Sequence, residues 1–266
     1  MKYQADAPTV VYSPHFDDAV LSCWTVLARP PASEVTSVYT GMPLEGNPPR
    51  NLELLDPQCR VRSNGVVYAP LQRLQAVRWH SLQAPLLRSW LQPHPAPASD
   101  EVIDTLAAAL PAASVVYAPA AIGGHPDHVI VRDAAILLVR HGVPVRLYAD
   151  LPYCLRKGWP SFIKGGRVEH DAAIARQWDR ALQTVPGLYG RARDATVVRL
   201  TRDECGAKHA TAARYLRQFG ALNSGVARLL DDPESFAYEL YWELPATLSP
   251  IGAEDPAVQH HPVTLR

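Results

Sequence analysis

Two short clusters of histidine and carboxylate residues are the part of this sequence best suited to do chemistry. The first, Ser13–Asp18, reads Ser-Pro-His-Phe-Asp-Asp and comes directly after the apolar run Thr9–Tyr12. The second, Gly123–His128, reads Gly-Gly-His-Pro-Asp-His and follows the β-branched run Ser114–Tyr117. The carboxyl ends of parallel strands open on one crevice, so two such clusters can meet there although they are far apart in the sequence.

The residue types in these clusters are those that bind a hydrolytic zinc ion. Such an ion needs three protein ligands of the imidazole or carboxylate type and one open position for water. His15 and Asp18 are three residues apart at a strand-to-helix turn, a spacing that puts both side chains on one side of the first helical turn. With His128 as the third ligand, we expect a Zn²⁺ site, and another divalent cation such as Fe²⁺ is the alternative.

Together the two clusters resemble the signatures of the PIG-L/LmbE family of zinc-dependent N-deacetylases. That family carries an Ala/Pro-His-x-Asp-Asp run followed by His-Pro-Asp-His, and both occur here in that order. The resemblance implies a Rossmann-like layout and the same three metal ligands. The first signature departs from its frequent form, because Phe16 replaces a proline and Ala19 replaces a glutamate. Neither position is an expected ligand or base.

The neighbours of the three ligands suit catalytic roles. We expect Asp17 to be the general base that takes a proton from the attacking water, which is the role of this aspartate in the family. We expect His125 to stabilise the tetrahedral oxyanion or to protonate the departing amine. Asp127 is expected to orient His125 or to favour its charged form.

A purely structural interpretation accounts for each cluster taken alone. Asp17 and Asp18 would then be a helix cap and a first-turn acid, and His125, Pro126 and Asp127 would form a capped helix start with Pro in the first position. Neither explanation requires a histidine after both strands. The metal site therefore explains the pair of clusters better.

Alternating strand and helix patterns position the two clusters. The predicted strands are 9–12, 34–39, 66–68, 114–117, 143–148 and 196–200, the predicted helices are 19–27, 102–110, 127–140, 171–184 and 203–219, and 71–91 fits helix or mixed structure. This order predicts an α/β fold, Rossmann-like, with a mostly parallel sheet and helices on both faces. We expect a single domain over residues 1–266, with 245–266 as a loose C-terminal tail.

The substrate pocket is less clear from the sequence. In relatives, the region that corresponds to residues 42–98 typically carries an Arg and a Glu near the substrate. Here that part falls to Arg50–Glu53, or to Arg60 and Arg62 without a glutamate, and the sequence does not decide between them. Arg62 and Tyr153, which stands in a Pro-Tyr turn similar to one in relatives, are the substrate-contact candidates.

Composition narrows the class of protein. Of the 266 residues, 47% are hydrophobic and 20% are charged, which is ordinary for a soluble globular protein. The 26 basic residues balance the 26 acidic ones, so no net field would attract nucleic acid or an anionic membrane. We expect no membrane span, no signal peptide and a cytoplasmic location. Cys23, Cys59, Cys154 and Cys205 lack metal or disulfide spacing and are expected to be buried or incidental thiols.

The sequence therefore predicts a zinc-dependent hydrolase that removes an N-acetyl or related N-acyl group from a small-molecule amino sugar or glycoconjugate. The sugar is implied by the resemblance alone, and residue spacing does not distinguish N-acetylglucosamine on an inositol, a thiol conjugate or a natural-product glycoside. A catalytically degraded metal-binding relative and a nucleotide-binding Rossmann-type protein are the alternatives. The segment Ser13–Asp18 argues against a nucleotide, because it lacks the required glycines and its carboxylates would repel phosphate. The oligomeric state is not indicated.

Overall fold

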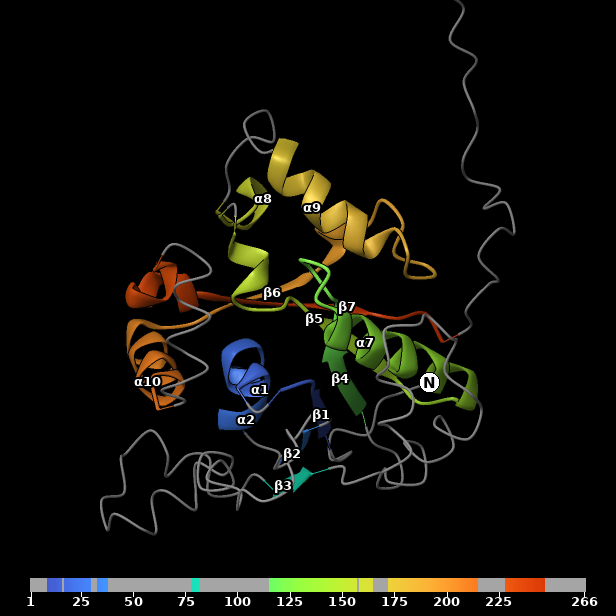
Figure 1. Cartoon of the computed structure of the whole chain (residues 1–266), viewed down its shortest axis with the longest axis horizontal. Coiled ribbons are helices and arrows are strands. Elements are labelled where there is room, and N and C mark those ends of the chain that lie inside the picture. Colours follow the sequence, from blue (N-terminus) through green and yellow to red (C-terminus); the bar gives the residue numbers. More distant parts are fainter. Residues whose placement is uncertain are drawn as a thin grey trace, which may run out of the picture.

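One seven-stranded sheet organises the part of the chain that the computed structural model describes, residues 9–15, 17–29, 33–37, 78–81, 115–156, 158–164, 172–214 and 228–246. The strands are β1 (Thr9–Ser13), β2 (Ser33–Ser37), β3 (Arg78–Ser81), β4 (Val115–Pro119), β5 (Val145–Tyr148), β6 (Thr196–Arg199) and β7 (Tyr238–Glu243). Their order across the sheet is β3-β2-β1-β4-β5-β7-β6 (Figure 1). The strands from β3 to β5 are parallel, and β7 is antiparallel to both of its neighbours. The predicted mostly parallel, Rossmann-like α/β fold is confirmed.

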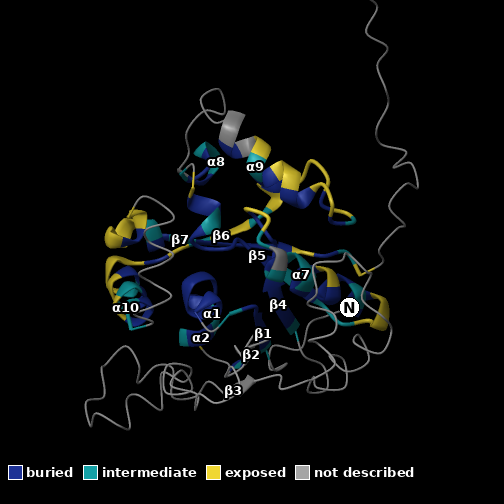
Figure 2. Ribbon diagram, viewed as in Figure 1, coloured by how far each residue is buried: buried dark blue, intermediate teal, exposed yellow. Residues whose placement is uncertain are grey.

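Helices cover both faces of this sheet. They are α1 (Asp18–Ser22), α2 (Trp24–Ala28), α7 (Pro126–Leu138), α8 (Ser161–Lys164), α9 (Ala172–Leu182) and α10 (Arg202–Ala212), with short 3₁₀ helices at Val139–His141, Tyr153–Leu155, Ala192–Asp194, Leu229–Asp231 and Pro233–Phe236. In Figure 1, α8 and α9 lie on one side of β5, β7 and β6, whereas α1, α2 and α10 lie on the other. Strands β1, β4, β5 and β7 and helix α1 are mostly buried, whereas most of β6 and the outer sides of α9 and α10 are exposed (Figure 2).

The order in which strands are added to the sheet reverses between β1 and β4. These two strands are adjacent and parallel, but β1 is followed by β2 on one side and β4 by β5 on the other. Such a topological switch point opens a crevice beyond the carboxyl ends of the two strands. The residues that follow Ser13 and Pro119 therefore meet at this crevice.

The inner strands are apolar on both faces because helices cover the sheet on both sides. Val10, Val11 and Val116 are each exposed by 2% or less. Five predicted strands coincide with β1, β2, β4, β5 and β6, and their ends are displaced by at most two residues. β3 lies inside the segment for which helix or mixed structure was expected, and the predicted strand 66–68 and helix 102–110 lie outside the described residues.

The helix predicted over 19–27 is two helices. The chain leaves the helical conformation at Cys23, where φ is −130° and ψ is 31°. The next two backbone N–H groups, of Trp24 and Thr25, donate to the carboxylate of Glu239 and not to the carbonyls four residues earlier. A contact with a residue so far along the chain is invisible to local periodicity, which explains why the prediction was wrong.

The later helices begin close to their predicted starts, but α10 ends at Ala212, before a turn at 213–214, whereas the prediction continued it to 219. α7 with its 3₁₀ extension ends at Gly142, whose φ of +76° is the left-handed conformation expected of a helix-terminating glycine. α10 begins one residue earlier than predicted, because Thr201 and Glu204 form a reciprocal capping box. β7, which separates β5 from β6, is a strand that the sequence pattern does not predict.

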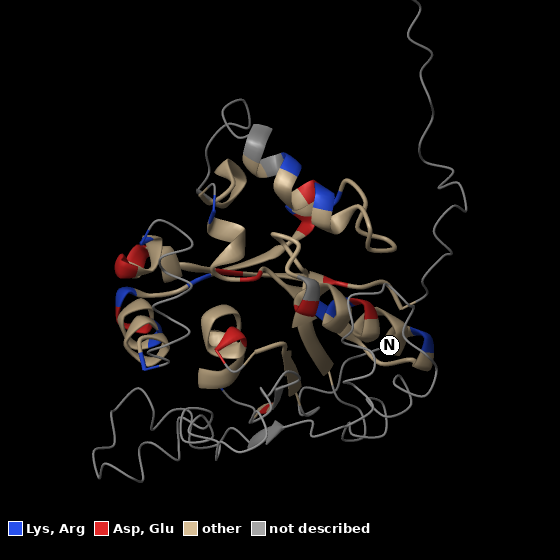
Figure 3. Cartoon of the chain, in the orientation of Figure 1, with Lys and Arg blue, Asp and Glu red and all other residues tan. Residues whose placement is uncertain are grey.

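Several other expectations can be compared with the described residues. Cys23, Cys154 and Cys205 are free and buried, as predicted, and Cys59 lies outside the described part. Of the predicted tail, only the first two residues are described, and Pro245 packs over Gly187. Charges of both signs are mixed along α9 and α10 (Figure 3). Among the described helices, none is long and apolar enough to cross a membrane.

Candidate metal centre

The first cluster is folded into a tight turn between β1 and α1. The Ser13 hydroxyl donates to the carbonyl of His15 and accepts from the N–H of Ala19 at 3.0 Å. The carboxylate of Asp18 accepts a hydrogen bond from the backbone N–H of His15 at 2.7 Å. These local hydrogen bonds bring the side chains of His15 and Asp18 together, with Asp17 as the residue that precedes α1.

The second cluster forms the start of α7. Gly123 and Gly124 have φ values of +101° and +71°, which let the chain turn sharply after β4. His125 is the N-cap residue and Pro126 follows at the first helical position. The Nδ1 atom of His125 accepts a hydrogen bond from the N–H of Asp127 at 3.3 Å.

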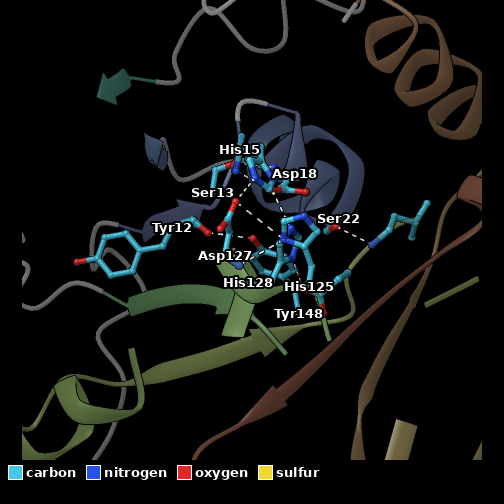
Figure 4. Close-up of polar contacts among 12 residues, drawn as sticks. Tyr12, Ser13, His15, Asp18, Ser22, His125, Asp127, His128 and Tyr148 are labelled. Carbon is cyan, nitrogen blue, oxygen red and sulfur yellow. Dashed lines mark hydrogen bonds and ion pairs between the residues drawn. The ribbon is translucent and has the colours of Figure 1, made fainter. Parts of the chain in front are cut away.

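The three predicted metal ligands come together at the crevice (Figure 4). Asp18 Oδ2 lies 3.2 Å from His15 Nδ1 and 3.3 Å from His128 Nε2. Two ligand atoms bound to a tetrahedral zinc ion at its usual distances are about 3.3 Å apart. The spacing of the donor atoms therefore fits a zinc ion.

Asp150, two residues beyond the end of β5, is a site residue that the sequence analysis did not identify. It is fully buried, and its Oδ1 lies 2.7 Å from His128 Nδ1 while its Oδ2 accepts from the N–H of Ile122 at 2.9 Å. A carboxylate on one ring nitrogen fixes the tautomer so that the other nitrogen has its lone pair free. The Nε2 atom of His128 is buried and points toward Asp18 Oδ2 at 3.3 Å, which is the arrangement expected of two ligands of one metal ion. The position of Asp150 at the end of a predicted strand was its only signal in the sequence.

In the metal-free protein, the three candidate ligands shift one another's pKa values. Burial would lower the pKa of His15, but hydrogen bonds to Asp127 and Asp18 outweigh it and raise the pKa to about 10. Burial would also lower the pKa of His128, but the charge of Asp18 and the hydrogen bond to Asp150 outweigh it and raise the pKa to about 10. Burial would raise the pKa of Asp18, but the two imidazolium groups hold it well below its usual range. A divalent cation would replace the imidazole protons.

Asp17, the expected general base, is a buried carboxylate next to the candidate ligand Asp18. It is 3% exposed, and its Oδ2 is buried without a hydrogen-bond partner among the described residues. Burial, with the adjacent charge of Asp18, raises the pKa of Asp17 to about 7 in the metal-free protein. A buried carboxylate oxygen without a partner costs folding free energy, so it is typical of a functional site.

The carboxylate of Asp127 lies closer to His15 than to His125, the histidine that it was expected to orient. Its Oδ2 lies 2.8 Å from Nε2 of His15 and 4.0 Å from Nδ1 of His125. The physical reason is that His125 Nδ1 already accepts the backbone N–H of Asp127, which occupies the near side of that ring. Asp127 therefore holds the outer nitrogen of His15, so that the Nδ1 atom of His15 faces Asp18.

Tyr153 forms a side of the same site. Its ring centroid lies 5.4 Å from that of His125 and 5.2 Å from that of His128. Gly123 makes this approach feasible, because a Cβ atom there would lie 2.7 Å from the Cβ of Tyr153. Burial, together with the charges of Asp18 and Asp17, raises the pKa of the Tyr153 phenol. The other substrate-contact candidate, Arg62, lies outside the described residues.

The fold is shared with solved deacetylases. A deacetylase from the biosynthesis pathway of teicoplanin is 25% identical, with 89% of this chain and 97% of that chain covered and a TM-score of 0.50. The zinc-inhibited form of a teicoplanin deacetylase is 23% identical, with 89% and 97% coverage and a TM-score of 0.51. A deacetylase of the A40926 pseudoaglycone is 20% identical, with 92% and 100% coverage and a TM-score of 0.52. No protein-family model and no curated protein matches the chain.

The fold and the site together define a class of protein. It is an α/β protein of the type seen in these deacetylases, with a candidate His-Asp-His metal centre at the switch point of its sheet. The likeness is consistent with the layout of the PIG-L/LmbE deacetylases that the two sequence signatures resemble.

Proposed function

We propose that this protein is a metal-dependent N-deacetylase that hydrolyses the N-acetyl, or a related N-acyl, group of an amino sugar or glycoconjugate. One observation carries the proposal: His15, Asp18 and His128 have the mutual spacing of zinc ligands, and the adjacent Asp17 has a buried carboxylate oxygen with no hydrogen-bond partner in the part of the chain that the structure describes. The fold shared with the teicoplanin-pathway deacetylase supports the reaction class.

The metal would be held by His15 Nδ1, Asp18 Oδ2 and His128 Nε2. A zinc ion there supplies a Lewis acid that polarises an amide carbonyl and makes water acidic near neutral pH. Asp127 and Asp150 hold the outer nitrogens of the two imidazoles, at 2.8 Å and 2.7 Å, which fixes the direction of the ligand lone pairs.

Asp17 would move the proton. As the attacking water adds to the amide carbon, one of its protons passes to the free carboxylate oxygen of Asp17. When the C–N bond breaks, the same proton passes to the departing amine, and acetate and a free amine are the products. A pKa of about 7 suits both directions of transfer near neutral pH.

His125 would stabilise the oxyanion as a neutral donor. Because its Nδ1 accepts the Asp127 N–H, a neutral imidazole carries its proton on Nε2, from which it can donate to the carbonyl oxygen. Burial and the neighbouring charges of His128 and His15 lower the pKa of His125, which favours this neutral form. Of the two roles expected for His125, the oxyanion donor is thus the better supported.

Tyr153 would contact the substrate. Tyr153 is partly exposed and its ring lies beside both His125 and His128, so it would line the side of the site where a sugar on the amide nitrogen binds. The raised pKa keeps its hydroxyl protonated, so it can donate a hydrogen bond.

The proposal is tested by metal analysis coupled to an amine-release assay. Purified protein, loaded with one equivalent of zinc, is assayed on N-acetylglucosamine, simple N-acetylated glycosides and compounds of the teicoplanin pathway. Release of acetate with an equal amount of free amine supports the proposal. Tight zinc binding without hydrolysis of any substrate would favour the catalytically degraded alternative, and copurified nucleotide without zinc would favour the nucleotide-binding one.

A further inference from the structure

A buried ion pair behind the metal centre has no part in the proposed chemistry. Lys208 Nζ on α10 lies 2.6 Å from Glu239 Oε1 on β7, and both residues are exposed by at most 1%. Such a pair is weak evidence for stability, because apolar residues of similar volume often replace it without loss. Its presence here needs an explanation other than stability.

The carboxylate of Glu239 is the centre of five hydrogen bonds. Its Oε1 accepts from the N–H of Trp24 at 2.6 Å and from Lys208 Nζ at 2.6 Å. Its Oε2 accepts from the N–H of Thr25 at 3.0 Å, the hydroxyl of Thr25 at 2.6 Å and the hydroxyl of Tyr241 at 2.7 Å. Helix α2, helix α10 and strand β7 are joined at this one group.

Glu239 accepts the hydrogen bonds of the backbone N–H groups that the break between α1 and α2 leaves without a helical partner. In one continuous helix the N–H groups of Trp24 and Thr25 would donate to carbonyls four residues earlier. The break at Cys23 leaves these two N–H groups in the interior, and Glu239 accepts both. An apolar side chain at position 239 would leave them unpaired at a cost in free energy, so the short length of α1 depends on this carboxylate.

The metal centre lies at the other end of the same short helix. Asp18 is the first residue of α1, and Ser22 is its last. Ser22, which lies near His128 in Figure 4, accepts a hydrogen bond at its Oγ from the N–H of Leu151 at 3.1 Å. Leu151 follows Asp150, whose carboxylate contacts His128. Both the Asp18 side and the His128 side of the site are thus anchored to α1. At about 1.5 Å per residue, a shift of the far end of α1 at Ser22 is transmitted over only about 6 Å to Asp18.

We propose that Glu239, neutralised by Lys208, is a positioning residue that sets the orientation of α1 and thereby the spacing between Asp18 and His128. This inference rests on the metal centre of the proposed function, but not on the identity of its substrate. A carboxylate is needed because only an acceptor with two oxygens can hold both free N–H groups of α2 and the Lys208 ammonium at once.

The test compares two substitutions on the same hydrogen-bonded group. Glu239→Gln keeps the shape but replaces one acceptor oxygen by a donor, so it loses a contact to α2. Tyr241→Phe, the matched control, removes the hydroxyl that donates to the same carboxylate and lies 3.2 Å from the Thr25 hydroxyl, and it leaves both backbone N–H contacts of α2 to Glu239 in place. Zinc affinity is measured by competition with a chelator, hydrogen exchange is measured on the peptide that spans residues 17–27, and melting temperature reports stability.

We expect Glu239→Gln to weaken zinc binding about tenfold and to speed exchange in the peptide, as loss of a supporting contact at a metal site does. We expect Tyr241→Phe to keep zinc affinity within twofold, whatever its melting temperature. Equal zinc affinity in Glu239→Gln and the parent, or an equal loss in both variants, overturns the inference. If Glu239→Gln does not fold, Thr25→Val, which removes one contact on the α2 side, is compared with Tyr241→Phe by the same criteria.

The zinc measurements separate this inference from the proposed function. A parent protein that binds zinc and shows the Glu239 effect, but hydrolyses no N-acyl substrate, overturns the function and leaves the inference standing. If the parent protein hydrolyses an N-acyl substrate but Glu239→Gln keeps full zinc affinity, the proposed function stands and the inference about Glu239 is overturned.

Discussion

At the scale of single residues, the metal centre depends on three donor atoms from two strand ends. We expect His15→Ala, Asp18→Ala and His128→Ala each to lose zinc, because each removes one of three protein ligands from an open site. The sheet should persist, because these side chains lie at its edge and not in its apolar core. Zinc content by atomic absorption with circular dichroism checks both statements. Full zinc occupancy in all three folded variants would show that the ligands lie elsewhere.

Asp150 provides a second test at this scale. We expect Asp150→Asn to weaken zinc binding about 10- to 100-fold, because an amide no longer stabilises the tautomer that leaves the Nε2 lone pair of His128 free. Asp133→Asn, on the exposed side of α7, is the matched control because it also removes one carboxylate charge. If both variants bind zinc like the parent, Asp150 does not support the metal ligand.

The candidate site could be predicted from the sequence only in part. His15, Asp18 and His128 stand in two recognisable runs at the ends of apolar strands, and parallel strand ends must meet. Asp150 is a lone carboxylate with no histidine near it in the sequence, so only the folded sheet shows its contact with His128. The closer contact of Asp127 with His15 could not be foreseen for a related reason, because it depends on the backbone N–H of Asp127 occupying the Nδ1 atom of His125.

At the scale of elements, the loop between β4 and α7 decides where Tyr153 lies. We expect Gly123→Ala to reduce the free energy of unfolding by about 1–3 kcal/mol and to lower substrate affinity, since its φ of +101° disfavours a side chain and its new Cβ would meet that of Tyr153. Gly124→Ala is the control, because its φ is also positive but no atom lies within 4 Å of the new Cβ. Urea denaturation and KM values compare them.

The KM values of the two glycine variants decide whether Tyr153 contacts the substrate. A loss of stability in both variants with a rise in KM only for Gly123→Ala assigns the ring of Tyr153 to the substrate. Equal KM values in the two variants would mean that the position of Tyr153 is irrelevant to binding.

Secondary structure was predicted well where the cause is local and poorly where it is distant. Strand ends and helix ends followed from runs of β-branched residues, from the glycine at 142 and from acidic first turns. The break at Cys23 could not be predicted from local patterns. The residue that accepts the freed N–H groups, Glu239, lies 215 residues beyond Trp24 in the chain. β7 was missed together with it, although it places Glu239 in the interior.

At the scale of the whole molecule, stability and zinc binding should respond oppositely to pH. The pKa values of His15 and His128 are raised to about 10 in the metal-free protein, from an unfolded value of about 6.5. Their stabilisation is therefore fully present below about pH 6.5 and is lost as the pH rises toward 10. Zinc must displace both imidazole protons, so its affinity rises over the same interval.

Calorimetry checks this pH dependence. We expect titration of metal-free protein with zinc near pH 8, in buffers of different ionisation enthalpy, to show release of about two protons per zinc ion. The melting temperature of the metal-free protein should fall from pH 6.5 to 10 while the increase caused by zinc grows. Zinc binding without proton release would show that the two imidazoles are neutral before the metal arrives.

The central claim is that Asp17 moves a proton for a metal held by its neighbours, and one variant tests it most directly. Asp17→Asn is loaded with zinc and assayed for acetate release beside the parent. We predict that it binds zinc with the same stoichiometry and turns over about 10²- to 10⁴-fold more slowly, because an amide does not accept the proton of the attacking water. Turnover at the parent rate with zinc bound would contradict the account.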